Sequence, residues 1–173
     1  MGTGANETAR RGVIGLGSNL GDRLAYLRGA VSRLQAEPGL RLVATSGVYE
    51  SPPMGPIAQA DFLNAAVLIE TTIAPRELLA RCLAIEAEHG RVREVRWGPR
   101  TLDLDLLWVE GVTVEEPGLT LPHPGLAERA FVLRPLAELL PDLVLGDGRN
   151  ARQAAEELHD DACVRLSGAH LGG

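Results

Sequence analysis

The chain has 173 residues, of which 45% are apolar, so it is long enough for a core of its own and a single domain over residues 1–173 is expected. Its formal net charge of -6 argues against nucleic acid as the main partner, and no run of about 18 apolar residues predicts a membrane span. All 17 basic residues are arginine, which excludes the lysine-dependent phosphate sites of P-loop proteins and protein kinases.

The first half of the chain predicts the order strand, helix, strand, strand. Residues 11–17 are apolar and punctuated by glycine, which indicates a buried strand. Leucines and valine at helical spacing from Leu24 to Leu34 predict a helix that begins after a cap at Asn19 or Asp22. Residues 40–50 and 62–71 then predict two further strands, separated by a proline-rich loop.

The second half predicts a helix, a strand and a C-terminal part. The expected elements are a helix from Pro75 to Gly90, a strand over 101–109, a short strand near 112–114, a loop at 121–124 and a helix over 131–140. The order βαββαβ predicts an α+β fold of the ferredoxin-like type, with an antiparallel sheet and helices on one face. Residues 1–10 are expected to form a flexible tail, and residues 149–173 a C-terminal extension.

A cluster of glycines occupies the point where the first strand leads into the first helix. Residues 15–22 read G-L-G-S-N-L-G-D, which differs from the G-x-G-x-x-G spacing of dinucleotide sites. A structural turn is therefore the better interpretation. The alternative, that these glycines let the backbone approach a ligand, stays open.

The segment R-W-G-P-R-T-L-D-L-D-L-L at residues 96–107 carries the strongest chemical signal. In an extended strand Asp103 and Asp105 share one face, about 7 Å apart, while leucines occupy the other. Such a pair can hold one or two hard cations. Four arginines crowd into residues 91–100, which predicts a site for magnesium and a polyphosphate nucleotide.

Other candidates are aromatic or polar residues near this segment. Phe62 and Asn64 share one strand face, and a ring beside an amide suits a flat, nitrogen-rich heterocycle. Phe131 is a candidate for a second ring, and Trp97 for a lid, although taken alone both phenylalanines are more typical of a core. His123 lies between two prolines that direct its ring outward from a loop.

Seven blocks in order resemble the 6-hydroxymethyl-7,8-dihydropterin pyrophosphokinase family, from about Val13 to Pro141. They are G-S-N-L-G-D at 17–22, Y-E-S-P-P-M-G at 49–55, D-F-L-N-A-A-V at 61–67, H-G-R-V-R at 89–93, R-W-G-P-R-T-L-D-L-D-L-L at 96–107, L-P-H-P at 121–124 and R-A-F-V-L-R-P-L at 129–136. The resemblance implies a ferredoxin-like enzyme that transfers pyrophosphate from ATP to the pterin alcohol. A monomer is expected, and a cytoplasmic location is expected because the N-terminal residues lack an apolar signal core.

The resemblance also implies roles for individual residues. Asp103 and Asp105 would hold two magnesium ions, and together with Arg91 and Arg100 they would form the catalytic set. The residues implied in ATP binding are Glu86, Arg91, Arg93, Arg100, His123 and Arg129. Those implied in pterin binding are Ser51, Pro52, Pro53, Met54, Gly55, Phe62, Asn64, Trp97 and Phe131.

The residues alone also allow two other classes of protein. One is a non-catalytic ferredoxin-like module that senses a small molecule, and the other is an RNA-binding sheet of the same element order. The RNA-binding class is disfavoured because the chain lacks an aromatic RNP segment and a basic surface. A sensor has no need for two aspartates among four arginines, and metal-dependent ATP binding would distinguish it from an enzyme.

Overall fold

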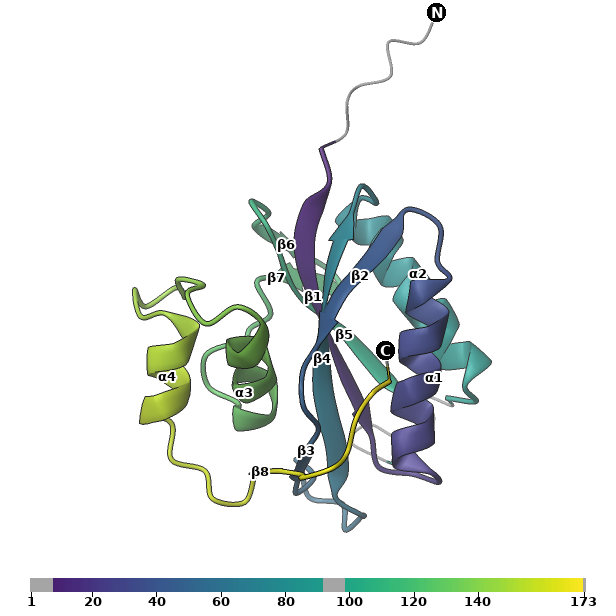
Figure 1. The fold of residues 1–173 in the computed structure, drawn as a ribbon, viewed down its shortest axis with the longest axis vertical. Helices are drawn as coiled ribbons and strands as arrows, with labels where there is room; N and C mark the ends of the chain where they lie inside the picture. The colour runs from purple at the N-terminus through teal and green to yellow at the C-terminus, as the bar shows by residue number, and fades with distance from the viewer. Residues whose placement is uncertain (1–7, 92–98, 173) are drawn as a thin grey trace, which may run out of the picture.

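The computed structural model describes residues 8–91 and 99–172, and it consists of an antiparallel sheet between two layers of helices (Figure 1). The elements in chain order are β1 Arg10–Ser18, α1 Arg23–Gln35, β2 Leu40–Thr45, β3 Tyr49–Ser51, β4 Phe62–Thr71, α2 Pro75–Glu88, β5 Asp103–Val109, β6 Val114–Glu116, β7 Leu119–Leu121, α3 Ala130–Leu139, α4 Ala151–Glu157 and β8 Val164–Arg165. The expected α+β class is confirmed.

The main sheet has the strand order β5-β1-β4-β3-β8, and β2 pairs with the other end of β4. All of these pairs are antiparallel. β4 is ten residues long, so one of its edges pairs with β1 from Leu63 to Thr71 while the other accommodates both β2 and β3. β1 and β4 therefore form the centre of the sheet.

The predicted strand over residues 40–50 is two strands in the structure. The hydroxyl of Ser46 accepts a hydrogen bond from the N–H of Ala66 at 2.8 Å, which inserts a side chain into the ladder between β2 and β3. The register also shifts between Leu42 and Ala44. A side chain that replaces a backbone partner interrupts a strand without any change in the apolar pattern, so the break was not visible in the sequence.

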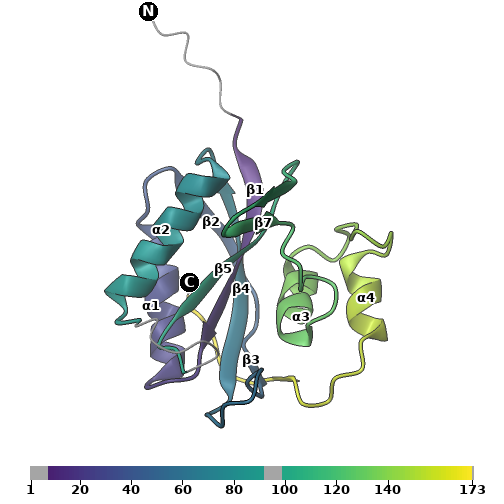
Figure 2. The same ribbon diagram turned by 180° about the vertical axis from the view of Figure 1, so that it is seen from behind.

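Helices cover both faces of the sheet, although the two helices of the expected βαββαβ core, α1 and α2, share one face as predicted. α1 and α2 lie on one side, while α3 lies on the other and α4 packs on its outer surface (Figures 1 and 2). The reason lies in β4, where every residue from Leu63 to Leu68 is buried although only alternate ones face α1 and α2. A strand that is apolar on both faces needs a layer on each.

The helix boundaries follow from local signals. The side chain of Asp22 accepts a hydrogen bond from the N–H of Ala25 at 3.1 Å, which identifies Asp22 as the cap of α1. Pro75 is the first residue of α2, as expected. Among the described residues, no helix is long and apolar enough to cross a membrane.

Two regions near the C-terminus are more ordered than predicted. β6 and β7 form a hairpin around Gly118, whose φ of 78° suits a tight turn, so the strand near 112–114 begins later and has a partner. The C-terminal extension adds α4 and β8, and Leu171 is only 3% exposed in the core beneath α1. Of the expected N-terminal tail, residues 1–7 lie outside the described residues, and β1 begins at Arg10.

Candidate active site

Three adjacent strands form the floor of a pocket on the α3 face of the sheet. Gly17 of β1 is paired with Asn64 of β4 on one side and with Asp103 of β5 on the other. One row of the sheet therefore reads Asn64, Gly17, Asp103. In the next row Gly15 is paired with Asp105, which is the second aspartate that the strand period places on this face.

The glycines of β1 keep the floor open. A Cβ atom at Gly17 would lie 3.3 Å from the Asn64 Oδ1 and 3.6 Å from the Phe62 ring. A Cβ atom at Gly15 would lie 3.2 Å from the Leu107 side chain. The two glycines belong to β1 and line the pocket, so they do not form a turn; close approach of their backbone to a ligand stays a prediction.

The pocket walls come from loops and from the start of α3. The residues that line the pocket are Gly15, Leu16, Gly17, Ser51, Pro52, Met54, Gln59, Phe62, Asn64, Ala65, Arg100, Asp103, Asp105, Leu107, Arg129, Phe131 and Val132. Asn64 is 6% exposed, and its side-chain N–H₂ donates to the Ser51 hydroxyl at 2.7 Å, which fixes the orientation of the amide. Phe62 and Phe131, predicted as a pair, are both part of this lining.

Asp103 is held by two guanidinium groups. Arg91 Nη1 lies 2.6 Å from its Oδ1, and Arg100 Nη1 lies 2.8 Å from its Oδ2. Arg91 also contacts the carboxylate of Glu86 at 2.9 Å, and both of these side chains are less than 10% exposed. Charges buried to this extent need partners, and the two carboxylates together compensate Arg91.

Asp105 has a different environment from Asp103. Asp105 is exposed to the water in the pocket, but the pocket walls surround its carboxyl group with protein atoms. The pKa of this carboxyl group is raised to about 7. The main cause is burial, followed by the negative charges of Asp103 and Glu86, while Arg100 and Arg91 act in the opposite direction. A further positive charge, from a cation, would stabilise the ionised form of Asp105.

His123 lies in a neighbouring hollow. This hollow shares Asp105 with the main pocket and is otherwise lined by Leu79, Leu106, Gly118, Leu119, Thr120, His123 and Pro124. The N–H of Gly125 donates to Nδ1 of His123 at 3.0 Å, so Nε2 is the atom left to carry a proton. Burial and then the charge of Arg129 lower the pKa of His123.

Some predicted site residues lie elsewhere. Pro53 and Gly55 belong to the pocket loop but do not line the pocket, and Arg93 and Trp97 lie outside the described residues. Glu86 is not on the helix surface: it is 2% exposed, and its carboxylate accepts a hydrogen bond from the N–H of Leu104 at 2.8 Å. The expected direct contact of Glu86 with ATP does not fit this position, because the carboxylate is enclosed by α2 and β5.

Sequence reasoning missed the role of Asn19, which joins three loops. Its Oδ1 accepts from the N–H of Arg100 at 2.8 Å, and its own N–H donates to the Arg100 carbonyl at 3.0 Å. Its side-chain N–H₂ donates to Gln59 Oε1 at 2.8 Å and to the Ala60 carbonyl at 3.0 Å. Asn19 was considered only as a helix cap, and nothing local to it indicates partners 40 and 81 residues away.

The fold and the pocket define a class of protein: an α+β protein that places two phenylalanines beside a cluster of carboxylates and arginines. Residues 13–141 match the family described as 7,8-dihydro-6-hydroxymethylpterin-pyrophosphokinase. The chain belongs to this family of pyrophosphokinases, so the resemblance inferred from the seven blocks is confirmed.

Relatives with the name 2-amino-4-hydroxy-6-hydroxymethyldihydropteridine pyrophosphokinase align over most of the chain. The protein from Methylorubrum extorquens is 53% identical over 156 residues, which are 90% of this chain and 98% of the relative. The protein from Pseudomonas aeruginosa is 43% identical over 160 residues, or 92% and 99% of the two chains.

Solved structures share the fold at low sequence identity. The HPPK-DHPS protein of Plasmodium falciparum superimposes with a TM-score of 0.67 at 13% identity, over 88% of this chain and 46% of that one. An HPPK-DHPS structure in complex with substrates gives 0.70 at 11% identity, over 86% and 43%. This chain therefore spans less than half of those longer proteins.

Proposed function

We propose that this chain transfers the diphosphate group of ATP to 6-hydroxymethyl-7,8-dihydropterin, a step of folate biosynthesis. The observation that carries the proposal is the row formed by Asn64, Gly17 and Asp103. Neighbouring strands are about 5 Å apart, so the amide and the carboxylate lie about 10 Å apart across an open glycine. A flat ring beside Asn64 would extend its substituent over Gly17 toward the carboxylates.

The pterin would occupy the half of the pocket on the β4 side. Phe62 and Phe131 would stack on its two faces, and Trp97 would close over it. The N–H₂ of Asn64 already donates to Ser51, while its Oδ1 faces Gly17 and is suited to accept from a ring N–H. The loop over residues 51–55 would read the ring edge with its backbone, which would include Pro53 and Gly55.

ATP would lie on the β5 side, with its nucleoside extending toward the hollow around His123. Arg100 and Arg129 line the main pocket, and Asp105 lines both the main pocket and the hollow around His123. The phosphates would therefore extend from the main pocket into that hollow. Arg93 and His123 are proposed as further phosphate contacts. Glu86 and Arg91 are proposed to act on ATP indirectly, because their contacts hold Asp103 and the N–H of Leu104 in place.

The carboxylate pair fits magnesium. No group of three or more His, Cys, Asp or Glu residues suited to a metal is found in the described part of the chain, but magnesium usually takes one or two carboxylates and completes its shell with water and phosphate oxygens. Asp103 and Asp105 would hold two such ions, which when bound would neutralise phosphate charge and lower the pKa of the attacking hydroxyl.

The reaction would be a direct displacement. The pterin hydroxyl oxygen forms a bond to the β-phosphorus of ATP and its proton passes to water, while the bond from that phosphorus to the oxygen bridging to the α-phosphorus breaks and AMP leaves with the bridging oxygen. The described pocket contains no cysteine or serine–histidine–aspartate set that would form a covalent intermediate. Catalysis would consist of positioning by the walls and charge stabilisation by Arg100 and Arg129.

The finer features of the fold and assembly are also proposals. The strand order β5-β1-β4-β3 with two helices on one face supports a ferredoxin-like core, to which α3, α4 and β8 are additions. A monomeric enzyme likewise stays a proposal. The net charge of -6 supports action without nucleic acid.

Phosphorus NMR of the purified protein with magnesium, ATP and 6-hydroxymethyl-7,8-dihydropterin tests the proposed function. AMP and a pterin diphosphate should appear together. The Asp103→Ala variant should fold, because Arg91 keeps Glu86 as a partner, but should lose nearly all of this activity. Formation of ADP and a pterin monophosphate, or no pterin-dependent use of ATP, would contradict the proposal.

A further inference from the structure

A cluster of hydrogen bonds outside the pocket joins α3, β3 and the C-terminal segment. The carboxylate of Glu138, near the end of α3, accepts a hydrogen bond from the Tyr49 hydroxyl and another, at 3.2 Å, from the N–H of Gly47. Arg165 of β8 reaches the same carboxylate at 3.3 Å. Figure 1 shows the chain passing from α4 beneath β3 at this point, so one side chain links three distant segments.

One face of α3 connects this cluster to the pocket. Phe131, Arg134 and Glu138 are spaced i, i+3 and i+7, which places them on the same face of a helix. Phe131 lines the pocket, and Glu138 lies about 10 Å further along the axis. Between them, Arg134 donates to the carbonyls of Leu158, Asp160 and Cys163, which binds this face to the C-terminal segment.

β3 connects the same cluster to the other pocket wall. Tyr49 and Ser51 are two residues apart, so they share a face of the strand. Ser51 is the residue that accepts the hydrogen bond from Asn64. The Tyr49 ring is 6% exposed and belongs to a small apolar cluster against which Phe131 also packs.

We propose that Glu138 is a positioning residue for the pterin site. Its bonds to Tyr49 and Gly47 set the separation between α3 and β3, and so the distance between the Phe131 ring and the Ser51–Asn64 pair. The inference rests on the proposed pterin site and adds a residue that does not touch the substrate.

The hydrogen bond from the Tyr49 hydroxyl to Glu138 is the main contact in this cluster. Arg165 is 59% exposed, and an ion pair with so exposed a partner contributes little. Burial, and next the Glu138 carboxylate, raise the pKa of Tyr49, so its hydroxyl stays protonated and donates at neutral pH.

The test is a comparison of Tyr49→Phe and Glu138→Ala with the unaltered protein. Tyr49→Phe keeps the buried ring and removes only the hydroxyl. Isothermal titration calorimetry would measure the Kd of 6-hydroxymethyl-7,8-dihydropterin with saturating magnesium and a non-hydrolysable ATP analogue, and separately the Kd of that analogue. Tyr49→Phe should bind the pterin about fivefold more weakly, the effect of losing one hydrogen bond, and Glu138→Ala at least as weakly, because it also removes the acceptor of the Gly47 N–H; both should bind the analogue as before. The double variant should bind the pterin no more weakly than Glu138→Ala alone, because the Glu138 change already removes the bond to Tyr49.

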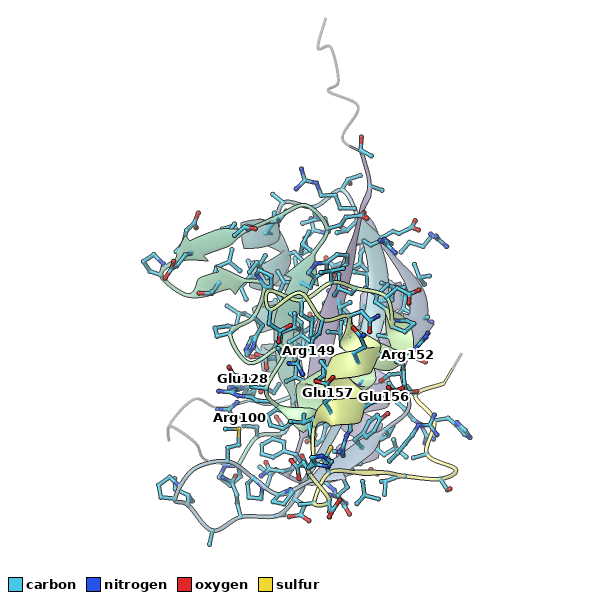
Figure 3. All side chains as sticks on the ribbon, turned by 90° about the vertical axis from the view of Figure 1, so that its left-hand side faces the viewer. Arg100, Glu128, Arg149, Arg152, Glu156 and Glu157 are labelled. Carbon is cyan, nitrogen blue, oxygen red and sulfur yellow. The ribbon has the colours of Figure 1, made fainter. Side chains whose placement is uncertain are left out.

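Glu157→Ala serves as the control. Glu157 pairs with Arg149 at 2.8 Å on the outer surface of α4, where Figure 3 labels both residues, and neither lines the pocket. It should bind both ligands as the unaltered protein does. Unchanged pterin binding in folded Tyr49→Phe and Glu138→Ala would overturn the proposal, as would equal weakening of both ligands. Asn64→Ala distinguishes this outcome from an incorrect pterin site. If the proposed site is correct, Asn64→Ala binds the pterin weakly, and if the site is incorrect, Asn64→Ala binds it normally.

Discussion

Gly17 shows how much of this site depends on the absence of a side chain. It lies between the amide of Asn64 and the carboxylate of Asp103, on the central strand of the site. Any Cβ atom there would contact residues of both proposed binding halves, since Phe62 and Asp103 are within 3.8 Å of the position it would take. The floor of the pocket is therefore formed by backbone.

Gly17→Ala should weaken pterin binding while leaving the fold intact. The added methyl group would occupy the floor 3.3 Å from Asn64 Oδ1, so we expect the KM for the pterin to rise about tenfold. Gly12→Ala is a matched control, because its Cβ atom would meet the Trp108 carbonyl at 3.3 Å, outside the pocket. Steady-state kinetics would decide: the same pterin KM in both variants would contradict the role assigned to Gly17.

Asp105 is predicted to reduce the stability of the metal-free protein above neutral pH. Its folded pKa, about 7, lies above the ordinary value of 3.8, so its contribution to stability is full below pH 3.8 and is lost as the pH rises through 7. In EDTA, Asp105→Asn should therefore raise the Tm at pH 8 by about 3 °C, with a smaller difference at pH 5.

The expected shift is only a few degrees because Asp105 is an exposed residue, so water within the pocket screens its charge. Glu115→Gln, a change at an exposed carboxylate of β6, is the control and should leave the Tm unchanged at both pH values. Thermal unfolding followed by circular dichroism would measure these shifts. An equal effect of Asp105→Asn at pH 5 and pH 8 would show that titration of Asp105 is not the cause.

At the scale of the elements, α2 and β5 are joined by buried polar groups as well as by apolar packing. Glu86 of α2 accepts from the N–H of Leu104 in β5 and pairs with Arg91, which in turn holds Asp103. The helix therefore fixes the strand at the level of the first pocket aspartate. Glu86, which the resemblance implied in ATP binding, therefore supports the site through Leu104 and Arg91.

Glu86→Ala should destabilise the protein strongly. It would leave a buried N–H without its acceptor and remove one of the two carboxylates that compensate Arg91, which we expect to cost about 3 kcal/mol. Glu88→Ala, two residues along the same helix, removes a 48% exposed carboxylate paired with Arg33 and should cost less than about 1 kcal/mol. Urea unfolding of both variants gives the comparison, and similar losses would contradict the role of Glu86.

At the scale of the whole molecule, the segment after α4 holds the two helical layers together. It passes from the α3 side to the α1 side, where Arg28 donates to the His170 carbonyl at 2.8 Å and Leu171 enters the main core (Figure 1). β8 pairs with β3 on the way. Residues beyond the family match, which ends at 141, thus complete the core around the site.

Leu171→Ala should lower the free energy of unfolding by about 2 to 3 kcal/mol, because a leucine that is 3% exposed leaves a cavity when truncated. Val164→Ala, in the same segment but 52% exposed, should have little effect. Chemical denaturation of the two variants would test this. Equal stability of both would mean that the C-terminal segment does not contribute to the core.

The sequence by itself determined the elements whose cause is local. The span of β4, Pro75 as the first residue of α2, and the common face of Asp103 and Asp105 follow from apolar run length, fixed proline geometry and the two-residue period of a strand. The motif around these aspartates was specific enough to indicate the family. Each of these signals is contained within about ten neighbouring residues.

Only the tertiary structure decided which distant residues meet. The row of Asn64, Gly17 and Asp103 depends on the register of three strands, the burial of Glu86 on the packing of α2 against β5, and the contacts of Asn19 on loops far along the chain. The second helical layer covers the other apolar face of β4, and the C-terminal segment supplies β8 to pair with the edge of β3. No local pattern in the sequence specifies either partner. Register and burial are set by contacts between segments, so they cannot be read from any one segment alone.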